Sequence, residues 1–280
     1  MSGLQPTEVD LAIDCDDTTR ILHGFIRREV ERTGRRRVVI GLSGGLDSAV
    51  SAGLAVGALG RERVVCVMMP YSSSSPASLA DARAVVGLLG CDSEVVEISS
   101  AVDALRDTSP EMDRVRLGNV MARARMVVLF DRSELHAALV LGTSNKTELL
   151  LGYGTLFGDL ASALNPIGDL YKTQVRQLAG HLGLPGPVLH KPPSADLWPD
   201  QTDEDELGFS YDEVDRLLAL LVDARVSRAA AIEAGFAETL VDRVTRLVLR
   251  SQFKRRMPLI AKISTRSIGW DFRYPRDWRS

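Results

Sequence analysis

One short motif of this 280-residue chain combines the residue types that bind phosphate and a divalent cation. The motif is SGGLDS at residues 43–48, between an apolar run and a helix-like segment. Its two glycines let the backbone turn tightly toward an anion, and the N–H groups of the following helix stabilise phosphate charge. A carboxylate in such a loop, Asp47, is explained if Mg²⁺ lies between it and the phosphates. We predict a phosphate-binding loop, with helix capping by Asp47 as the alternative.

The loop is not of a common nucleotide-binding type. It lacks the Gly-Lys-Ser/Thr ending of the Walker motif, and it lacks the G-x-G-x-x-G spacing of dinucleotide dehydrogenases. Strand, glycine turn and helix in succession are nevertheless typical of a parallel sheet.

The segments around the loop predict how it is positioned. We expect strands in residues 35–42, 63–70, 93–99 and 137–143, and helices in residues 7–32, 47–60, 77–90, 113–135, 169–185, 211–222 and 240–253. The strands are continuous apolar runs, as expected where helices cover both faces of a sheet. The expected fold is therefore α/β, a doubly wound parallel sheet flanked by helices, with a C-terminal helical extension.

Composition limits the classes of protein. With 45% hydrophobic and 25% charged residues, the chain is neither disordered, fibrous nor a disulfide scaffold. A net charge of −3 gives no cationic field for nucleic acid. Three cysteines without metal or redox spacing, no signal-peptide pattern and no apolar run near 20 residues lead us to expect a cytoplasmic protein without membrane contact.

The loop is similar to the pyrophosphate loop of the N-type ATP pyrophosphatases, which cleave ATP between its α and β phosphates. Further segments resemble the ammonia-dependent NAD⁺ synthetases and the synthetase domain of their glutamine-dependent relatives. These segments are GNVMARARM (118–126), LGTSNKTELLLGYGTLFGDLA (141–161), KPPSADLWPDQTDEDELG (191–208) and FKRR (253–256). The resemblance covers most of the chain and implies an adenine nucleotide alpha hydrolase-like fold.

The resemblance also assigns residues to ligands. It implies ATP contacts from Gly41, Leu42, Ser43, Gly44, Gly45, Leu46, Asp47, Ser48, Thr143, Lys172 and Ser194. It implies deamido-NAD contacts from Asn119, Arg123, Glu148 and Lys254. Asp47 and Glu148 would be Mg²⁺ ligands, and Asp47 and Lys172 would be catalytic. Asn119 and Arg123 are four residues apart, so a helix would present both on one face.

The implied reaction is the ATP-dependent amidation of deamido-NAD by ammonia, through an adenylated nicotinate, with release of pyrophosphate and AMP. The implied cofactor is Mg²⁺, with ATP as co-substrate, and family members are homodimers. We expect a single synthetase domain over residues 1–280, with its ATP pyrophosphatase core at about 20–190 and C-terminal helices and a basic tail at about 191–280. No glutaminase is visible, so a separate partner glutaminase remains an open nitrogen source.

Two other functions stay open from the residues. One is a different N-type ATP pyrophosphatase that transfers sulfur or an amido group, and the other is a non-catalytic nucleotide-binding regulatory module. Some positions also depart from the ammonia-dependent pattern. Leu156 and Ala163 stand where many such members carry a lysine and an aspartate that contact the dinucleotide, which brings this chain nearer the glutaminase-fused branch.

Overall fold

The computed structural model describes residues 9–194, 196–198, 201–256 and 258–268, which include a four-stranded parallel sheet. Its strands are β1 (Arg37–Gly41), β2 (Val64–Met68), β3 (Asp92–Val95) and β4 (Ala138–Leu141), in the order β3-β2-β1-β4. In the register, Val39 of β1 lies opposite Val65 of β2 on one side and Val140 of β4 on the other. The predicted doubly wound α/β sheet is confirmed.

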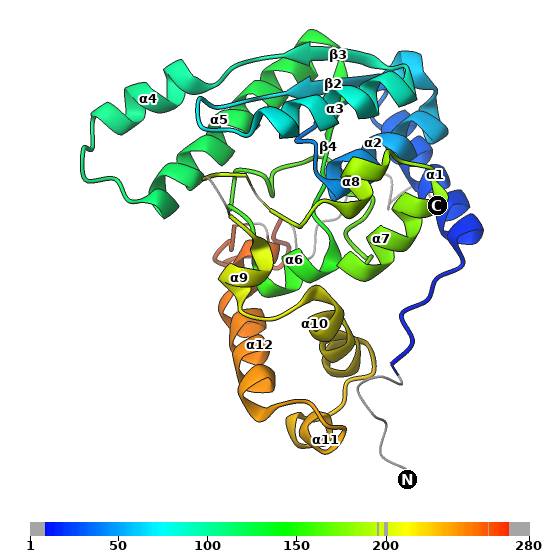
Figure 1. Cartoon of the computed structure of the whole chain (residues 1–280), viewed down its shortest axis with the longest axis vertical. Helices are drawn as coiled ribbons and strands as arrows, with labels where there is room; N and C mark the ends of the chain where they lie inside the picture. Colours follow the sequence, from blue (N-terminus) through cyan, green and yellow to red (C-terminus); the bar gives the residue numbers. More distant parts are fainter. Residues whose placement is uncertain (1–8, 195, 199–200, 257, 269–280) are drawn as a thin grey trace.

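Helices cover both faces of this sheet (Figure 1). One face packs on α1 (Cys15–Arg32), α2 (Leu46–Leu59), α3 (Pro76–Leu89), α7 (Lys172–His181) and α8 (Gly186–His190), and the other on α4 (Ser99–Asp107) and α5 (Arg114–Leu135). Successive strand residues point to opposite faces, so Val38 and Ile40 join the first core while Val39 joins the second. Both sides of β1, β2 and β4 are therefore apolar, whereas the edge strand β3 has the sequence DSEV and is mostly exposed.

The C-terminal helices form a third core, separate from the two cores on the faces of the sheet, at the lower end of the molecule in Figure 1. The sheet and the helices on its two faces are called the sheet layers below. It contains residues of α6 (Lys146–Leu151), α9 (Asp203–Leu207), α10 (Tyr211–Leu218), the π-helical segment Ala219–Asp223, α11 (Arg228–Glu233) and α12 (Glu238–Arg250). Short 3₁₀ helices lie at Arg61–Arg63 and Gln252–Arg255. α6 and α7 thus connect the sheet layers to the C-terminal helices.

Some element boundaries differ from the predicted ones. The first helix begins at Cys15 because the side chain of Asp14 accepts a hydrogen bond from the Asp17 N–H at 2.9 Å. Residues 191–208 lie outside the helices and strands expected from the sequence, but α9 forms there because the Thr202 side chain caps it at Asp205 N, 3.2 Å away. The third strand ends at Val95, before α4.

The predicted basic tail includes residues 269–280, which lie outside the described residues, as do residues 1–8. Within the described ranges, no helix combines the length and the apolar character that crossing a membrane requires.

The strand order reverses next to β1, because the chain continues to β2 on one side and later places β4 on the other. In open α/β sheets, ligands bind beyond the carboxyl ends of the strands at such a reversal. The SGGLDS loop follows β1, and residues 142–145 follow β4. The fold therefore brings two of the predicted ligand-binding segments together.

Candidate active site

The SGGLDS loop turns sharply between β1 and α2. Gly44 has a φ of +79°, and a Cβ atom there would lie 2.1 Å from the carbonyl oxygen of Ser78. The hydroxyl oxygens of Ser43 and Ser48 lie 3.1 Å apart, and the Ser43 N–H donates to the Ser48 hydroxyl at 3.3 Å. Gly45 is the N-cap of α2 and Asp47 lies in the first turn. The capping alternative for Asp47 is therefore wrong, and its carboxylate makes other contacts.

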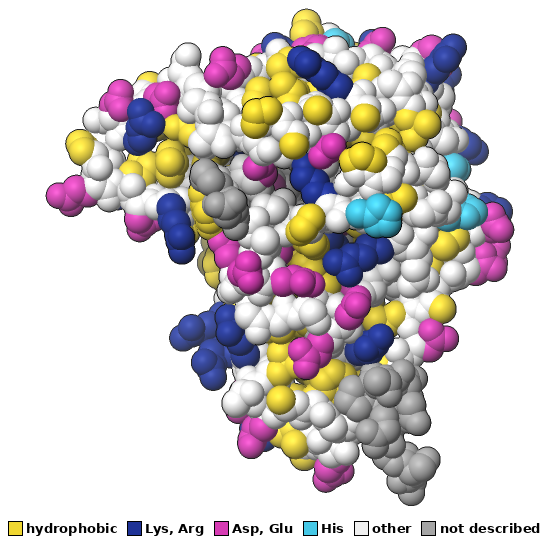
Figure 2. All heavy atoms as spheres, viewed as in Figure 1, with side chains coloured by type: hydrophobic (Ala, Val, Ile, Leu, Met, Phe, Trp, Pro, Cys, Tyr) yellow, Lys and Arg dark blue, Asp and Glu magenta, His cyan; other side chains and the backbone are white. Residues whose placement is uncertain are grey.

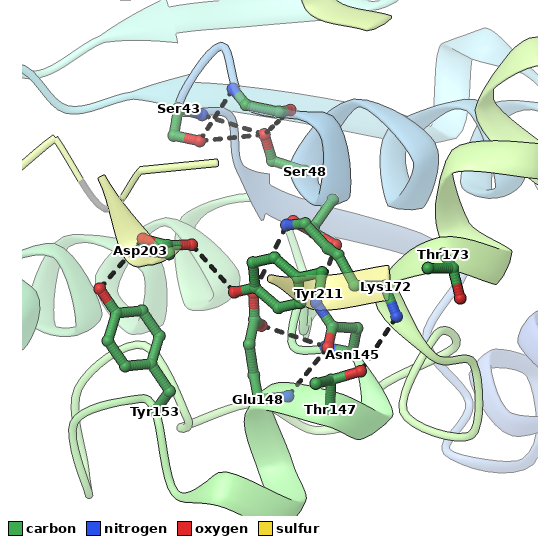
Figure 3. A network of polar contacts seen from close by, with 12 residues as sticks. Ser43, Ser48, Asn145, Thr147, Glu148, Tyr153, Lys172, Thr173, Asp203 and Tyr211 are labelled. Carbon is green, nitrogen blue, oxygen red and sulfur yellow. Dashed lines mark hydrogen bonds and ion pairs between the residues drawn. The ribbon is translucent and has the colours of Figure 1, made fainter. Parts of the chain in front are cut away.

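Those contacts centre on Lys172, the first residue of α7. Its side chain is 4% exposed, its ammonium forms an ion pair with Asp47, and its Nζ lies 3.6 Å from Oε1 of Glu148 in α6. Asn145, the N-cap of α6, donates from Nδ2 to the second oxygen of Asp47 at 3.1 Å. Figure 3 shows Asn145, Glu148 and Lys172 in one polar network. Residues predicted from three distant segments thus meet.

The electrostatics of this group follow from one ammonium shared by two buried carboxylates. Burial by itself lowers the pKa of Lys172, but the charges of Asp47 and Glu148 outweigh it and raise the pKa, so the ammonium stays charged. Burial and then the negative charge of Asp47 raise the pKa of Glu148 to about 8, although Lys172 acts in the opposite direction. When both carboxylates are ionised, the site has more negative charge than one lysine balances, so a further cation would favour the ionised form of Glu148.

A second polar group lies beside this one and contains Asp203 of α9. The hydroxyls of Tyr153 and Tyr211 each donate to Asp203 at 3.0 Å, as Figure 3 shows, and the Tyr153 hydroxyl also donates to Glu206 at 2.8 Å. The Lys172 ammonium lies 5.3 Å from the centre of the Tyr211 ring. Residues of the 191–208 segment are therefore fastened over the site by two tyrosines.

These groups border a cavity of about 630 Å³. On the face drawn in Figure 2, acidic and basic side chains gather around a hollow between the sheet layers and the C-terminal helices. Fifteen residues were predicted to contact ligands, and those that line the cavity are Gly41, Leu42, Ser43, Gly45, Leu46, Asp47, Ser48, Thr143, Glu148, Lys172 and Ser194. Gly44 lies behind the wall, where its carbonyl is 3.5 Å from the Lys191 ammonium.

Three predicted dinucleotide contacts, Asn119, Arg123 and Lys254, instead hold the loop after α6. The Thr155 hydroxyl donates to Oδ1 of Asn119 at 2.7 Å, and Arg123 donates to the Leu156 carbonyl at 3.2 Å. Lys254 donates to the carbonyls of Gly152 and Gly154 at 2.8 and 2.7 Å. Asn119 and Arg123 share one helix face as expected, and all three support a loop whose residues, among them Thr155, line the cavity.

Cavity residues that were not predicted include Arg125 and Lys191. Arg125 donates from Nε to the Met69 carbonyl at 3.1 Å, and burial lowers its pKa. Because Arg125 is two residues from Arg123, their side chains point in different directions on a helix. The repeated ARAR pattern did not indicate which of the two arginines lines the cavity. The Lys191 ammonium donates hydrogen bonds to Asp81 at 2.9 Å and to Ser78 at 3.1 Å. Its position as the first residue of the 191–208 segment could have indicated that it lines the cavity.

Comparison with known proteins indicates one family. A family model described as NAD synthase matches residues 18–258. A protein of Chlorobium phaeobacteroides named NH(3)-dependent NAD(+) synthetase is 56% identical over 271 residues, which cover 97% of this chain and 98% of that protein.

Two solved structures are similar over 90% of this chain and 100% of their own chains. The NMN synthetase of Francisella tularensis has a TM-score of 0.79 at 32% identity. The NH3-dependent NAD synthetase of Campylobacter jejuni has a TM-score of 0.75 at 37% identity.

Replacing Gly44 with alanine tests the geometry of the loop. The left-handed φ and the contact with the Ser78 carbonyl should lower the free energy of unfolding by roughly 1–3 kcal/mol, measured by urea denaturation. Gly87→Ala is the matched control, because an added Cβ there meets open space on α3. It should raise stability slightly, by up to about 1 kcal/mol. Equal denaturation midpoints for the two variants would contradict the loop geometry described here.

Proposed function

This chain belongs to the NAD synthase family, and from that premise we propose that it makes NAD⁺ from deamido-NAD, ATP and ammonia. The observation that carries the proposal is the meeting of Asp47, Glu148 and Lys172 in the cavity beside the SGGLDS loop. Cleavage of ATP between its α and β phosphates needs positioned positive charge more than a nucleophilic side chain. A buried lysine next to a glycine-rich loop at a helix N-terminus meets that need.

In the first step, the nicotinate carboxylate attacks the α-phosphorus of ATP, and the bond to pyrophosphate breaks. We assign the phosphates to the backbone of residues 41–48, with Thr143 and Ser194 as further ATP contacts. Lys172, held in its charged form, neutralises charge that develops on the phosphate oxygens. The product of this step is adenylated nicotinate and free pyrophosphate.

Asp47 and Glu148 have the donor set that Mg²⁺ prefers, two carboxylates in one cavity. Among the described residues, no group of three or more His, Cys, Asp or Glu side chains is placed to hold a metal ion. Mg²⁺ bound by these two residues would therefore need phosphate oxygens of ATP to complete its ligand shell, as is usual for this ion. When bound, Mg²⁺ would supply charge neutralisation at the phosphates.

In the second step, ammonia attacks the carboxyl carbon, the bond to AMP breaks and a proton leaves the nitrogen. Water would hydrolyse the adenylated intermediate, so the site must exclude it. We assign that role to the segment around Asp203, which Tyr153 and Tyr211 hold against the site. The loop held by Asn119, Arg123 and Lys254 would form the deamido-NAD side of the cavity.

The predicted single domain of residues 1–280, the cytoplasmic location and a separate glutaminase as nitrogen source remain proposals. The other functions left open by the sequence, transfer of sulfur or another amido group and nucleotide binding without turnover, make different products.

The activity assay uses the purified chain with ATP, MgCl₂ and ammonium chloride. NAD⁺, AMP and pyrophosphate should form together, and only when deamido-NAD is present. Pyrophosphate release without deamido-NAD would favour another ATP pyrophosphatase, and ATP binding without release would favour a regulatory module. Replacing ammonium with glutamine should stop NAD⁺ formation, because the relative that matches 97% of this chain is named an NH(3)-dependent NAD(+) synthetase.

Asp47→Asn should reduce NAD⁺ formation by at least about a hundredfold, because the amide removes the negative charge that holds Lys172 and the proposed Mg²⁺. Circular dichroism should show an unchanged fold, since asparagine has nearly the same shape. Asp107→Asn, at an exposed position in α4, is the control and should retain activity. Full activity of Asp47→Asn would refute the metal role.

The exposed apolar side chains of α5 support the proposed homodimer. Val127 and Phe130 are three residues apart and exposed, whereas Met121 of the same helix is buried in the sheet core. A second copy of this chain would cover them, so light scattering should give twice the chain mass of 30.5 kDa. The double variant Val127→Glu and Phe130→Glu should be a monomer, because buried unpaired carboxylates oppose association. Leu88→Glu, at an exposed site on α3, should stay dimeric.

A further inference from the structure

A buried carboxylate lies next to the proposed catalytic group but does not contact the cavity described above. Asp215 of α10 is 0% exposed. Its Oδ1 accepts a hydrogen bond from the Thr147 hydroxyl at 2.5 Å, and its Oδ2 accepts from the N–H and the hydroxyl of Thr173 at 2.8 and 2.9 Å. Burial raises the pKa of Asp215, and the hydrogen bonds from the two threonines act in the opposite direction.

The two threonines are the chain neighbours of the residues that meet Asp47. Thr147 precedes Glu148 in α6, and Thr173 follows Lys172 in α7. The Thr147 hydroxyl also accepts a hydrogen bond from the Lys172 N–H at 3.0 Å. Figure 3 shows Thr147 beside Glu148 and joined by a dashed line to Lys172.

These contacts supplement the cap of α7, in which the Tyr171 N–H donates to Oε1 of Gln174 at 2.9 Å. The N-cap residue, Tyr171, makes no side-chain hydrogen bond to the end of the helix. Instead, the first N–H group binds a side chain of α6 and the second binds a side chain of α10. The positive end of the α7 dipole therefore faces the Asp215 carboxylate, which stabilises both.

We propose that Asp215 is a positioning residue for the reaction, which fixes the first turns of α6 and α7 so that Glu148 and Lys172 face Asp47. This inference rests on the proposed function. Asp215 acts through Thr147 and Thr173, and it does not touch the substrates. It couples the C-terminal helices to the site, because α10 belongs to the third core.

The chemistry of the contacts requires a carboxylate. Three donors converge on Asp215, and an ionised carboxylate accepts from all of them. An asparagine has one acceptor oxygen, and its NH₂ group would compete with the Lys172 N–H for the Thr147 oxygen. Asp215→Asn thus disturbs the orientation of both helix ends while leaving the side-chain volume almost unchanged.

The experiment compares Asp215→Asn with Leu217→Ala, a buried residue of the same helix without these polar contacts. Asp215→Asn should lower kcat for NAD⁺ formation by about tenfold or more while KM for ATP changes less than about threefold, because Lys172 would be misplaced in the transition state. Leu217→Ala should lower Tm but keep kcat within about twofold, measured where both proteins are folded. A kcat of Asp215→Asn within twofold of the parent chain would overturn the proposal, as would an equal loss in Leu217→Ala.

A second pair of variants covers the case in which Asp215→Asn does not fold. Thr147→Val removes the hydroxyl that links Lys172 to Asp215, and Thr147→Ser keeps it. The kcat of the valine variant should be about tenfold lower than that of the parent chain, and the serine variant should keep the parent kcat. Equal kcat values for the two variants would overturn the proposal.

Hydrogen exchange supplies a readout that needs no catalysis. The amides at the start of α7 should exchange faster in Asp215→Asn than in the parent chain, while those at the start of α2 should be unchanged. Unchanged exchange in α7 would overturn the positioning role even if the chain makes NAD⁺. Absence of NAD⁺ formation by the parent chain would instead refute the proposed function and leave the exchange result to stand by itself.

Discussion

The structure depends on a buried ammonium shared by two carboxylates. Lys172, Asp47 and Glu148 come from α7, α2 and α6, and removing the ammonium would leave two buried carboxylates without their cation. The three helix ends must therefore converge within a few ångströms. The reversal of strand order next to β1 makes this possible, because α2 follows β1 and α6 follows β4 at the same edge of the sheet.

The C-terminal helices have a polar function in addition to their apolar core. Asp203 of α9 and Asp215 of α10 are both buried, and each accepts hydrogen bonds from side chains that adjoin the Lys172 group. A buried carboxylate is tolerated only when donors surround it, so each one constrains the elements that supply the donors. The sheet layers and the C-terminal helices are thereby fixed relative to each other at the site, and not only by hydrophobic contact.

Features that depend on local sequence patterns could be predicted, and features that depend on contacts between distant residues could not. The strands and the long α5 helix were predictable because their apolar patterns are local, and SGGLDS was recognisable because its glycines and Asp47 are adjacent. The convergence of Asp47, Glu148 and Lys172 followed only from resemblance to a family, since no local pattern links them. α9 was missed because prolines dominate its segment, while Thr202 supplies the cap.

Asp215 was missed for a different reason. In the pattern YDEVD it is one of three acids near the start of a helix, and nothing local shows which acid turns inward. Helix periodicity places it with Tyr211 and Leu218 on the buried face. Because aspartate is rarely buried, the residue type by itself favours an exposed position. Its meaning depends on Thr147 and Thr173, which are 68 and 42 residues away.

The hydrogen bonds of Lys254 and Arg255 to α6 and the loop after it affect the order in which the protein assembles during synthesis. Lys254 holds the carbonyls of Gly152 and Gly154, and Arg255 donates to those of Leu149 and Leu150, about a hundred residues earlier. A nascent chain that has already formed its sheet still lacks these contacts until residues 254 and 255 have been added. A chain that stops before residue 254 would therefore keep the SGGLDS loop but lose the side chains that hold the loop after α6.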